Sequence, residues 1–340
     1  METTVSNIFR SNVVRISFSI RSVQISLYLK SSNNIIMRLF GEAVGHDIRT
    51  YLTLLRPFTL LAPLIVSSSV ILASLRTSGS IDLPVVSLIL VIFSASFCFA
   101  LLNGASNVLN QATDWNEDAI SKPYRPIPQG LITPKKAYTF SILLYLVALL
   151  LSLSVHVLFS CIISIIALFS ITYSCAPRMK KFLLLNQLWV ALPRGFFGIV
   201  GSWSVFGNPF EPLPLAMGCV AALFLFGGTA TKDILDADAD RTVGTKTLVN
   251  VFGLRAAAVF SLVVMTCAFG LILPLVYFGF IQITLLPLAS LCVLSVIIGW
   301  LMFHNHKNTT CENTSAWILM YATYFIFALS FAGITISFSA

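Results

Sequence analysis

Long stretches of this chain contain no charged side chain, and this feature limits the folds open to it more than any other. Residues 256–306, for example, include no Asp, Glu, Lys or Arg. A helix that crosses the hydrocarbon core of a membrane needs about 20 apolar residues, so this stretch has room for two crossings. Only 10% of the 340 residues are charged, too few to cover a soluble core of this size. The sequence therefore predicts an integral membrane protein.

The uncharged stretches predict an all-α, polytopic protein with nine transmembrane helices. We expect these helices at 58–75, 83–110, 137–177 (two helices), 182–206, 212–231, 256–306 (two helices) and 315–338. His156 marks the turn within the first paired stretch, and Tyr277 and Gly279 mark the turn within the second. Arg194 is the only charged residue inside a predicted span, and a charge at that depth is costly unless it faces a cavity or a counter-charge.

The Lys and Arg residues are concentrated in loops on one side of the predicted bundle. With the N-terminus inside, Arg76 is the only base in a loop on the opposite side. Short loops rich in Lys and Arg stay cytoplasmic, so we expect this side to face the cytoplasm or the equivalent interior of an organelle. The pattern does not distinguish the plasma membrane from an organelle inner membrane. The net charge of +8 favours anionic lipids or substrates, and bases spread over separate loops do not suggest nucleic acid.

Residues 1–45 are predicted to be a basic leader or extension that precedes a transmembrane domain at 46–340. The first 37 residues contain four bases, eight serines and a single acid, Glu2. This composition is typical of an organelle transit peptide. A simple N-terminal extension, or a start at Met37, agrees with it equally well.

The acidic residues are clustered where chemistry is expected. Seven of the thirteen lie in two loops on the predicted cytoplasmic side: Asp114, Glu117 and Asp118 after the second span, and Asp233, Asp236, Asp238 and Asp240 after the sixth. On a helix that continues out of the membrane, a stripe within an arc of about 80° contains Asn103, Asn107, Asn110, Asp114 and Asp118. Asp233, Asp236 and Asp240 also share a face, and Asp238 points away from it.

Two helix ends that carry carboxylates and face each other suit Mg²⁺, which takes one or two carboxylates and leaves its other positions to water and phosphate oxygens. Two other interpretations are open. The acids could be solvated loop charges that balance nearby bases. A cation-coupled transporter would also need such acids, although its acids are expected near the middle of the membrane.

Around these acids the chain resembles the UbiA superfamily of membrane-embedded polyprenyltransferases. Residues 110–118, NQATDWNED, followed by AISKPYRPIPQG, resemble its first signature, and KDILDADADRTVGTKTL is similar to its second. LRPF at the first span and YSCAPRMKK after the fourth are similar to further family elements. The resemblance covers nearly the whole chain after about residue 45.

This resemblance implies a bundle around a central, lipid-accessible cavity, in which an isoprenyl diphosphate binds with its head on Mg²⁺. The implied metal ligands are Asn110, Asp114, Asp118, Asp233, Asp236 and Asp240, of which Asp114, Asp118, Asp236 and Asp240 are also implied to be catalytic. The bases implied to bind the diphosphate are Arg56, Lys122, Arg125, Arg178, Lys180 and Lys232. Arg194 and Tyr173 are candidates for contact with the acceptor.

The implied reaction is the Mg²⁺-dependent transfer of an isoprenyl chain to a lipophilic or aromatic acceptor, with release of diphosphate. Quinone precursors, chlorophyll precursors and glyceryl phosphate lipids are acceptors in the branch that the motifs resemble. A terpene cyclase of the same superfamily is the nearest alternative, and a cation-coupled transporter is the alternative from another class. No protein partner is indicated.

The chain departs from the family pattern at two positions. Gln111 replaces an acid that often follows the first Asn, so one carboxylate is missing there. Many relatives have Lys four residues after the Tyr of the fourth span, but Tyr173 is followed at that spacing by Pro177, with Arg178 and Lys180 beyond it. For Arg194 we expect contact with an anionic acceptor or the diphosphate, and the alternative is a structural role near Pro193.

Overall fold

The computed structural model describes residues 42–79, 83–304 and 314–338. The chain divides into two compact units, one that ends at Thr53 and one that begins at Leu54. Helix α2 (Glu42–Leu55) begins in the first unit and ends in the second. The predicted leader at 1–45 lies outside the described residues as far as residue 41, so its boundary remains a prediction.

Eight stretches of helix in the second unit are long and apolar enough to cross a membrane, counted over the described ranges. They are α3 (Pro57–Thr77), α4 (Val85–Thr113), α6 (Pro134–Leu153), α7 (Val157–Ser174), α10 (Pro212–Gly228) with η3 (Thr229–Thr231), α12 (Leu248–Gly270) with α13 (Ile272–Tyr277), η4 (Ile283–Leu291) with α14 (Cys292–His304), and α15 (Ser315–Phe338). The same ranges contain no β-strand, which confirms the predicted all-α class.

The span predicted at 182–206 forms three consecutive segments instead of one long helix. They are α8 (Leu185–Ala191), the π-helical segment η2 (Leu192–Phe196) and α9 (Phe197–Trp203). Pro193 has no N–H and so interrupts the α-helical pattern, and the N–H of Phe197 bonds to the carbonyl oxygen of Leu192, five residues back. The eight long stretches match eight of the nine predicted spans, and the ninth corresponds to this broken segment, which is not among the helices of the described ranges that are long enough to cross a membrane.

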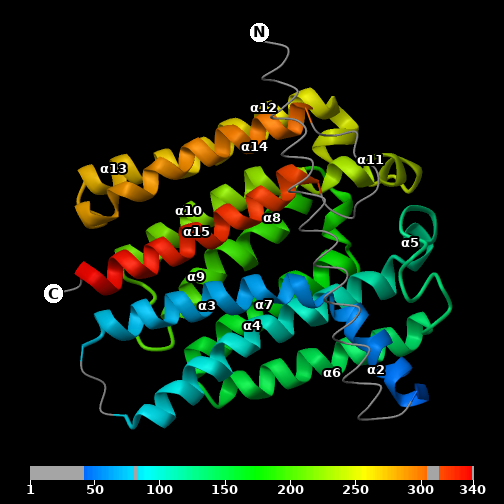
Figure 1. Cartoon of the computed structure of the whole chain (residues 1–340), viewed down its shortest axis with the longest axis horizontal. Helices are drawn as coiled ribbons and strands as arrows, with labels where there is room; N and C mark the ends of the chain where they lie inside the picture. The colour runs from blue at the N-terminus through cyan, green and yellow to red at the C-terminus, as the bar shows by residue number, and fades with distance from the viewer. Residues whose placement is uncertain (1–41, 80–82, 305–313, 339–340) are drawn as a thin grey trace. The chain divides into compact units, whose positions relative to one another are not determined.

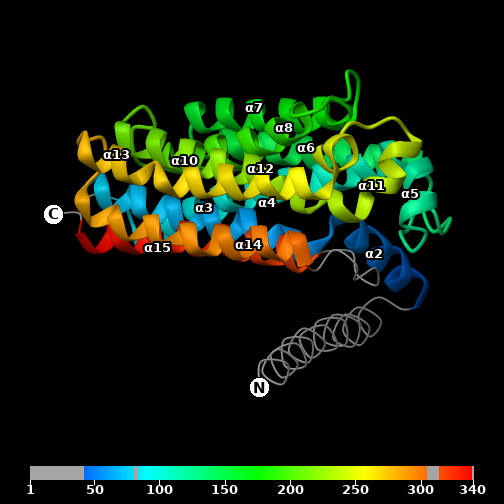
Figure 2. The ribbon, with the colours of Figure 1, turned by 90° about the horizontal axis from the view of Figure 1, so that it is seen from above.

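The long helices of the second unit lie side by side with nearly parallel axes (Figure 1). Helix α5 (Trp115–Ser121) follows α4, and helix α11 (Asp233–Thr242) follows α10 and η3. Both views place α5 and α11 together at one end of the bundle, with α13 at the other end (Figure 1, Figure 2). The fold therefore brings the two acidic motifs, which are far apart in sequence, to the same end.

The bundle is apolar both inside and outside. The rings of Phe224 and Phe269 contact each other in the larger buried cluster, and Phe99 packs on Phe159 in a smaller one. Other apolar side chains on the long helices, such as Phe93 on α4 and Leu150 on α6, are more exposed than buried. Helices that are apolar all round are typical of membrane spans. The protein is thus an integral, multi-pass membrane protein.

Polar side chains on α4, including part of the predicted stripe, donate hydrogen bonds to the backbone near the start of α3. Arg56 has a left-handed backbone (φ 54°) directly before Pro57, and this break leaves nearby carbonyl oxygens without helical partners. The Nε2 of Gln111 donates to the carbonyl of Leu54 at 2.8 Å, and the Nδ2 of Asn107 donates to the carbonyl of Leu55 at 3.0 Å. Gln111 thus makes an amide contact that a carboxylate could not make.

Asn103 has the same kind of role, because its Nδ2 donates to the carbonyl of Thr59 at 3.0 Å. The stripe therefore has two parts. Asn103 and Asn107 support the start of α3. The remaining members, Asn110, Asp114 and Asp118, lie toward the end of the bundle that carries α5. The prediction that one helix continues out of the membrane here is wrong in one detail. Helix α4 ends at Thr113 and α5 begins at Trp115, with Asp114 between them. This break turns the Asp114 side chain toward the bases that follow α7.

Candidate active site

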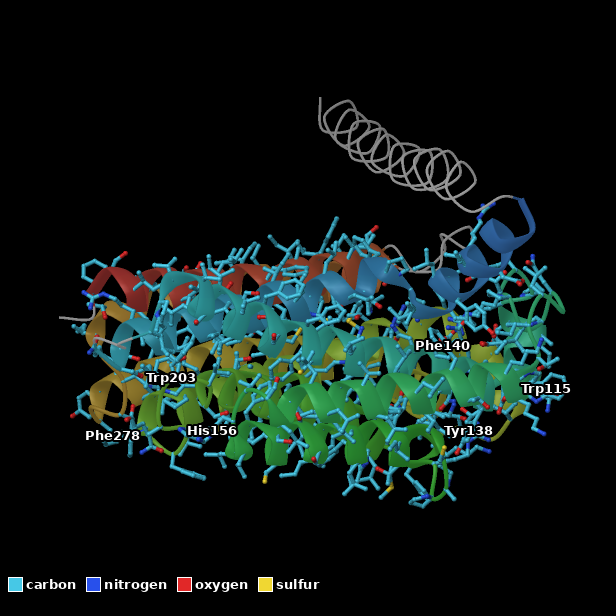
Figure 3. All side chains as sticks on the ribbon, turned by 90° about the horizontal axis from the view of Figure 1, so that it is seen from below. Trp115, Tyr138, Phe140, His156, Trp203 and Phe278 are labelled. Carbon is cyan, nitrogen blue, oxygen red and sulfur yellow. The ribbon has the colours of Figure 1, made fainter. Side chains whose placement is uncertain are left out.

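A polar chamber of about 240 Å³ lies at the end of the bundle that carries α5 and α11. Figure 3 locates this end by Trp115, the first residue of α5, and shows Trp203 and Phe278 toward the opposite end. The lining includes all six predicted metal ligands: Asn110, Asp114, Asp118, Asp233, Asp236 and Asp240. It also includes Arg56, Lys122, Arg125, Lys180, Lys232, Tyr173 and Arg194.

Arg178 is the one predicted site residue that does not line the polar chamber. Its backbone is left-handed (φ 56°), and its Nη2 lies 2.7 Å from Oδ1 of Asp114 and 3.4 Å from Oε1 of Glu117. Lys180 contacts the other carboxylate oxygen of Asp114 and does line the chamber. Of the two bases after the fourth span, Lys180 is thus the one placed to reach a ligand. Burial lowers the pKa of Lys180, and the Asp114 carboxylate opposes this shift.

A second ion pair is almost completely buried. The Nη1 of Arg125 donates to both carboxylate oxygens of Asp118, at 2.9 and 2.7 Å. Burial raises the pKa of Asp118, although the charge of Arg125 acts to lower it. Both residues follow the end of α4, so this pair fixes the turn that leads from α5 into the loop.

The second acidic motif enters the chamber from α11. The Oδ1 of Asp236 lies 2.7 Å from Nζ of Lys122, so this ion pair links the two motifs. Asp233 is buried, and its Oδ2 has no hydrogen-bond partner among the described residues. Burial raises the pKa of Asp233 to about 7, and burial together with the nearby Asp236 carboxylate raises the pKa of Asp240 to about 6. Asp238 points away, with its side chain 96% exposed.

The acids face one chamber, but they do not form a closed cluster. Within the described ranges, no three His, Cys, Asp or Glu side chains are close enough to hold a metal ion by themselves. Like charges repel, and the bases Lys122, Lys180 and Arg125 lie between or beside the carboxylates. The donor set still suits Mg²⁺, because every candidate ligand is an oxygen and the buried Oδ2 of Asp233 has no hydrogen-bond partner in the described part of the chain.

An apolar chamber of about 150 Å³ adjoins the polar one. Its walls include Phe99, Leu102, Ile166, Leu225 and Met320 from four different helices. Five residues with large side chains line both chambers, and we call them the collar: Tyr173, Arg194, Lys232, Trp317 and Tyr321. A ligand with a charged head and an apolar tail would fit this arrangement of chambers.

The collar residues are held by specific contacts. The Nζ of Lys232 donates to the hydroxyl of Tyr173 at 2.8 Å, and the rings of Trp317 and Tyr321 stack with centroids 4.7 Å apart. The hydroxyl of Tyr324 donates to the backbone carbonyl of Arg194 at 2.7 Å, so a neighbouring side chain supports the π turn. A Cβ on Gly195 would lie 2.5 Å from Cα of Ala222, so glycine allows this turn to pack closely on α10.

Several lining residues were not predicted from the sequence. Asn186, Thr245, Thr247, Trp317 and Tyr321 all border the polar chamber. Trp317 and Tyr321 are four residues apart and so share a helix face, but the uniformly apolar span does not indicate which face is inward. Asn186 is eight residues before Arg194, a spacing that could have placed both on one side of the fifth span.

The comparison with known proteins agrees with this architecture. A family model, the UbiA prenyltransferase family, matches residues 60–327. Digeranylgeranylglyceryl phosphate synthase of Methanobrevibacter smithii is 28% identical over 278 residues, which cover 79% of this chain and 92% of that protein. The same synthase of Methanosarcina mazei is 33% identical over 210 residues, covering 60% of this chain and 71% of that protein.

The fold is also similar to solved structures. A UbiA homologue from Archaeoglobus fulgidus, bound to GPP and Mg²⁺, aligns with a TM-score of 0.64 at 17% identity, over 85% of this chain and 98% of that chain. The family match extends over most of the chain, including both acidic motifs and the collar. This chain therefore belongs to the UbiA prenyltransferase family and, as such, is a membrane-embedded prenyltransferase.

Proposed function

We propose that this chain transfers an isoprenyl chain from a polyprenyl diphosphate to a hydroxyl group of a glyceryl phosphate lipid and releases diphosphate. The observation that carries the proposal is the pair of adjoining chambers, one lined by acids and bases and the other by apolar side chains. The acceptor class is supported by the relatives of the chain, several of which are named digeranylgeranylglyceryl phosphate synthase.

Mg²⁺ is the proposed cofactor. The ligands would come from Asn110, Asp114, Asp118, Asp233, Asp236 and Asp240, which surround the polar chamber. When bound, Mg²⁺ supplies positive charge that stabilises the negative charge growing on the leaving diphosphate. The carboxylates of both motifs would hold this charge at one place, and the Oδ2 of Asp233, which has no hydrogen-bond partner among the described residues, would be a free oxygen donor for it.

The bases of the chamber would bind the diphosphate oxygens. Lys122 and Lys180 now pair with Asp236 and Asp114, and a Mg²⁺–diphosphate complex offers opposite charges to both members of each pair. Lys232, Arg56 and Arg125 add positive charge around the same space. Arg178 would act indirectly, by holding the Asp114 carboxylate from outside the chamber.

The allylic carbon would lie at the collar, with the isoprenyl tail in the apolar chamber. As the C–O bond to the diphosphate breaks, the carbon gains cationic character, which the ring faces of Tyr173 and Tyr321 can stabilise. Apolar walls also exclude water, which would otherwise trap the cation. Arg194, which lines both chambers, would bind the phosphate of the acceptor.

We place the polar chamber on the cytoplasmic side, or on the equivalent interior side of an organelle. The argument is the distribution of bases, since Lys122, Lys180 and Lys232 belong to the basic loops and Arg76 lies at the far end of α3. Labelling of single cysteines introduced at Lys135 and at Ser78 with a membrane-impermeant reagent, in intact and opened vesicles, would test this orientation.

The central experiment measures diphosphate release from geranylgeranyl diphosphate by purified protein in detergent. Release that requires both Mg²⁺ and geranylgeranylglyceryl phosphate would support the proposal. Release with 4-hydroxybenzoate, homogentisate or a chlorophyllide instead would identify another acceptor. Release without any acceptor, with a hydrocarbon product, would support the terpene cyclase alternative, whereas Mg²⁺ binding without release would favour a transporter.

A further inference from the structure

Asn186 stands out among the residues of the polar chamber because it is buried and incompletely bonded. Its side chain is in α8, only 2% of the residue is exposed, and its Oδ1 has no hydrogen-bond partner among the described residues. Buried polar atoms are normally paired, so an unpaired one beside a ligand chamber needs an explanation. A ligand that enters the chamber could supply the missing donor.

The position of Asn186 relative to Arg194 supports this interpretation. Asn186, Val190 and Arg194 follow one another at intervals of four residues, and all three line the polar chamber. A straight α-helix rotates slightly at each such interval, and the wider π turn of η2 offsets the rotation before Arg194. One side of the broken span thus lines the same space with an amide, an apolar side chain and a cation.

The neighbouring Gln187 shows that an unpaired amide alone does not mark a site. Gln187 is completely buried, and neither atom of its amide has a partner within the described part of the chain, but it lines neither chamber. Asn186 differs because it borders the space where a substrate would bind. The two adjacent residues therefore form a natural pair of test position and control.

We propose that Asn186 is a specificity-determining residue that binds the reacting hydroxyl of the acceptor lipid. This inference rests on the proposed function, in which Arg194 binds the phosphate of the same molecule. The amide oxygen can only accept a hydrogen bond, so it selects an O–H group over an ether or a hydrocarbon. An O–H that donates to Asn186 also keeps a lone pair free to face the allylic carbon.

The transfer of the isoprenyl chain forms one C–O bond and breaks another. The hydroxyl oxygen forms a C–O bond to the allylic carbon as the bond from that carbon to the diphosphate oxygen breaks. The hydroxyl proton is released to the departing diphosphate, because an amide is too weak a base to keep it. Asn186 thus orients the nucleophile and takes no part in the proton balance.

The test compares the affinity of the wild-type protein and of Asn186→Leu for geranylgeranylglyceryl phosphate and for its analogue without the free hydroxyl. In wild type we expect the hydroxyl compound to bind about 10-fold more tightly. In Asn186→Leu, which keeps the approximate volume but removes the amide, we expect this preference to disappear. The affinity for geranylgeranyl diphosphate should differ by less than about twofold between the two proteins.

Gln187→Leu is the matched control and should keep the wild-type preference for the hydroxyl compound. Persistence of the preference in Asn186→Leu, or an equal loss of affinity for both compounds, would overturn the assignment of Asn186. If wild type turns over geranylgeranyl diphosphate but does not bind geranylgeranylglyceryl phosphate, the proposed acceptor is wrong and the inference falls with it. If wild type turns over geranylgeranylglyceryl phosphate normally but Asn186→Leu keeps the preference for the hydroxyl compound, the inference about Asn186 is wrong and the proposed function stands.

Discussion

The Nζ of Lys122 lies 2.7 Å from Oδ1 of Asp236, and this ion pair joins the two acidic motifs across the polar chamber. The residues come from opposite halves of the chain and meet because α5 and α11 extend from the same end of the bundle (Figure 1). A base between two sets of acids lowers their mutual repulsion. In the proposed function, the same base would turn to the diphosphate when a cation takes its place beside Asp236.

Replacing Asp236 tests the metal assignment. Asp236→Ala should lower turnover by at least about 10²-fold, equivalent to about 2.7 kcal/mol of barrier, because a proposed Mg²⁺ ligand is lost. Diphosphate release measures the effect, and gel filtration in detergent checks the fold. Asp238→Ala is the control, since Asp238 is on the same helix but 96% exposed. Near-normal turnover of Asp236→Ala would contradict the assignment.

The two bases after the fourth span should differ in their effect on the donor. Lys180 lines the polar chamber, whereas Arg178 contacts Asp114 from outside it. Lys180→Met should therefore raise the KM for geranylgeranyl diphosphate by about 10-fold or more, as expected for the loss of one charge-assisted hydrogen bond. Arg178→Met should have a smaller effect on this KM. Initial rates at saturating Mg²⁺ distinguish the variants, and the reverse order would place Arg178 on the phosphate.

Mg²⁺ binding should weaken in mild acid. Burial raises the pKa of Asp233 to about 7, and burial with the Asp236 carboxylate raises the pKa of Asp240 to about 6. The metal binds the ionised carboxylates, so protons compete increasingly as the pH falls through 7 and then 6. The apparent Kd for Mg²⁺ should be about 10-fold larger at pH 5.5 than at pH 8, measured by calorimetry. Asp240→Asn should flatten this profile, and Asp238→Asn should not.

Much of the site could be predicted because short loops constrain where charged residues go. Asp114 and Asp236 each follow a long span closely, so the end of the bundle was the only place for both. Arg178 has a left-handed backbone and contacts Asp114 without lining the polar chamber, an arrangement that charge spacing does not reveal. Asn103 and Asn107 share a helix face with Asp114, but Asn107 bonds to the carbonyl of Leu55 at the break before α3, and Asn103 bonds to that of Thr59, whose helical partner would be Pro63, which has no N–H. Asn186 carries no charge and belongs to no motif, so its position in the chamber depends on the packing of α8.

The length of the isoprenyl chain should depend on Gly198, which lines the apolar chamber. A Cβ at this position would lie 3.6 Å from the carbonyl oxygen of Pro193 and 3.9 Å from the hydroxyl of Tyr324, so Gly198→Ala should fold and work normally. The larger side chain of Gly198→Leu would occupy part of the space for the tail. We expect kcat/KM for geranylgeranyl diphosphate to fall by about 10-fold or more, and that for geranyl diphosphate to change by less than about threefold, since each buried methylene contributes about 0.8 kcal/mol. Equal losses with both donors would mean that Gly198 lies beside the first isoprene units, which both donors share, and no loss with either donor would mean that the tail does not reach Gly198.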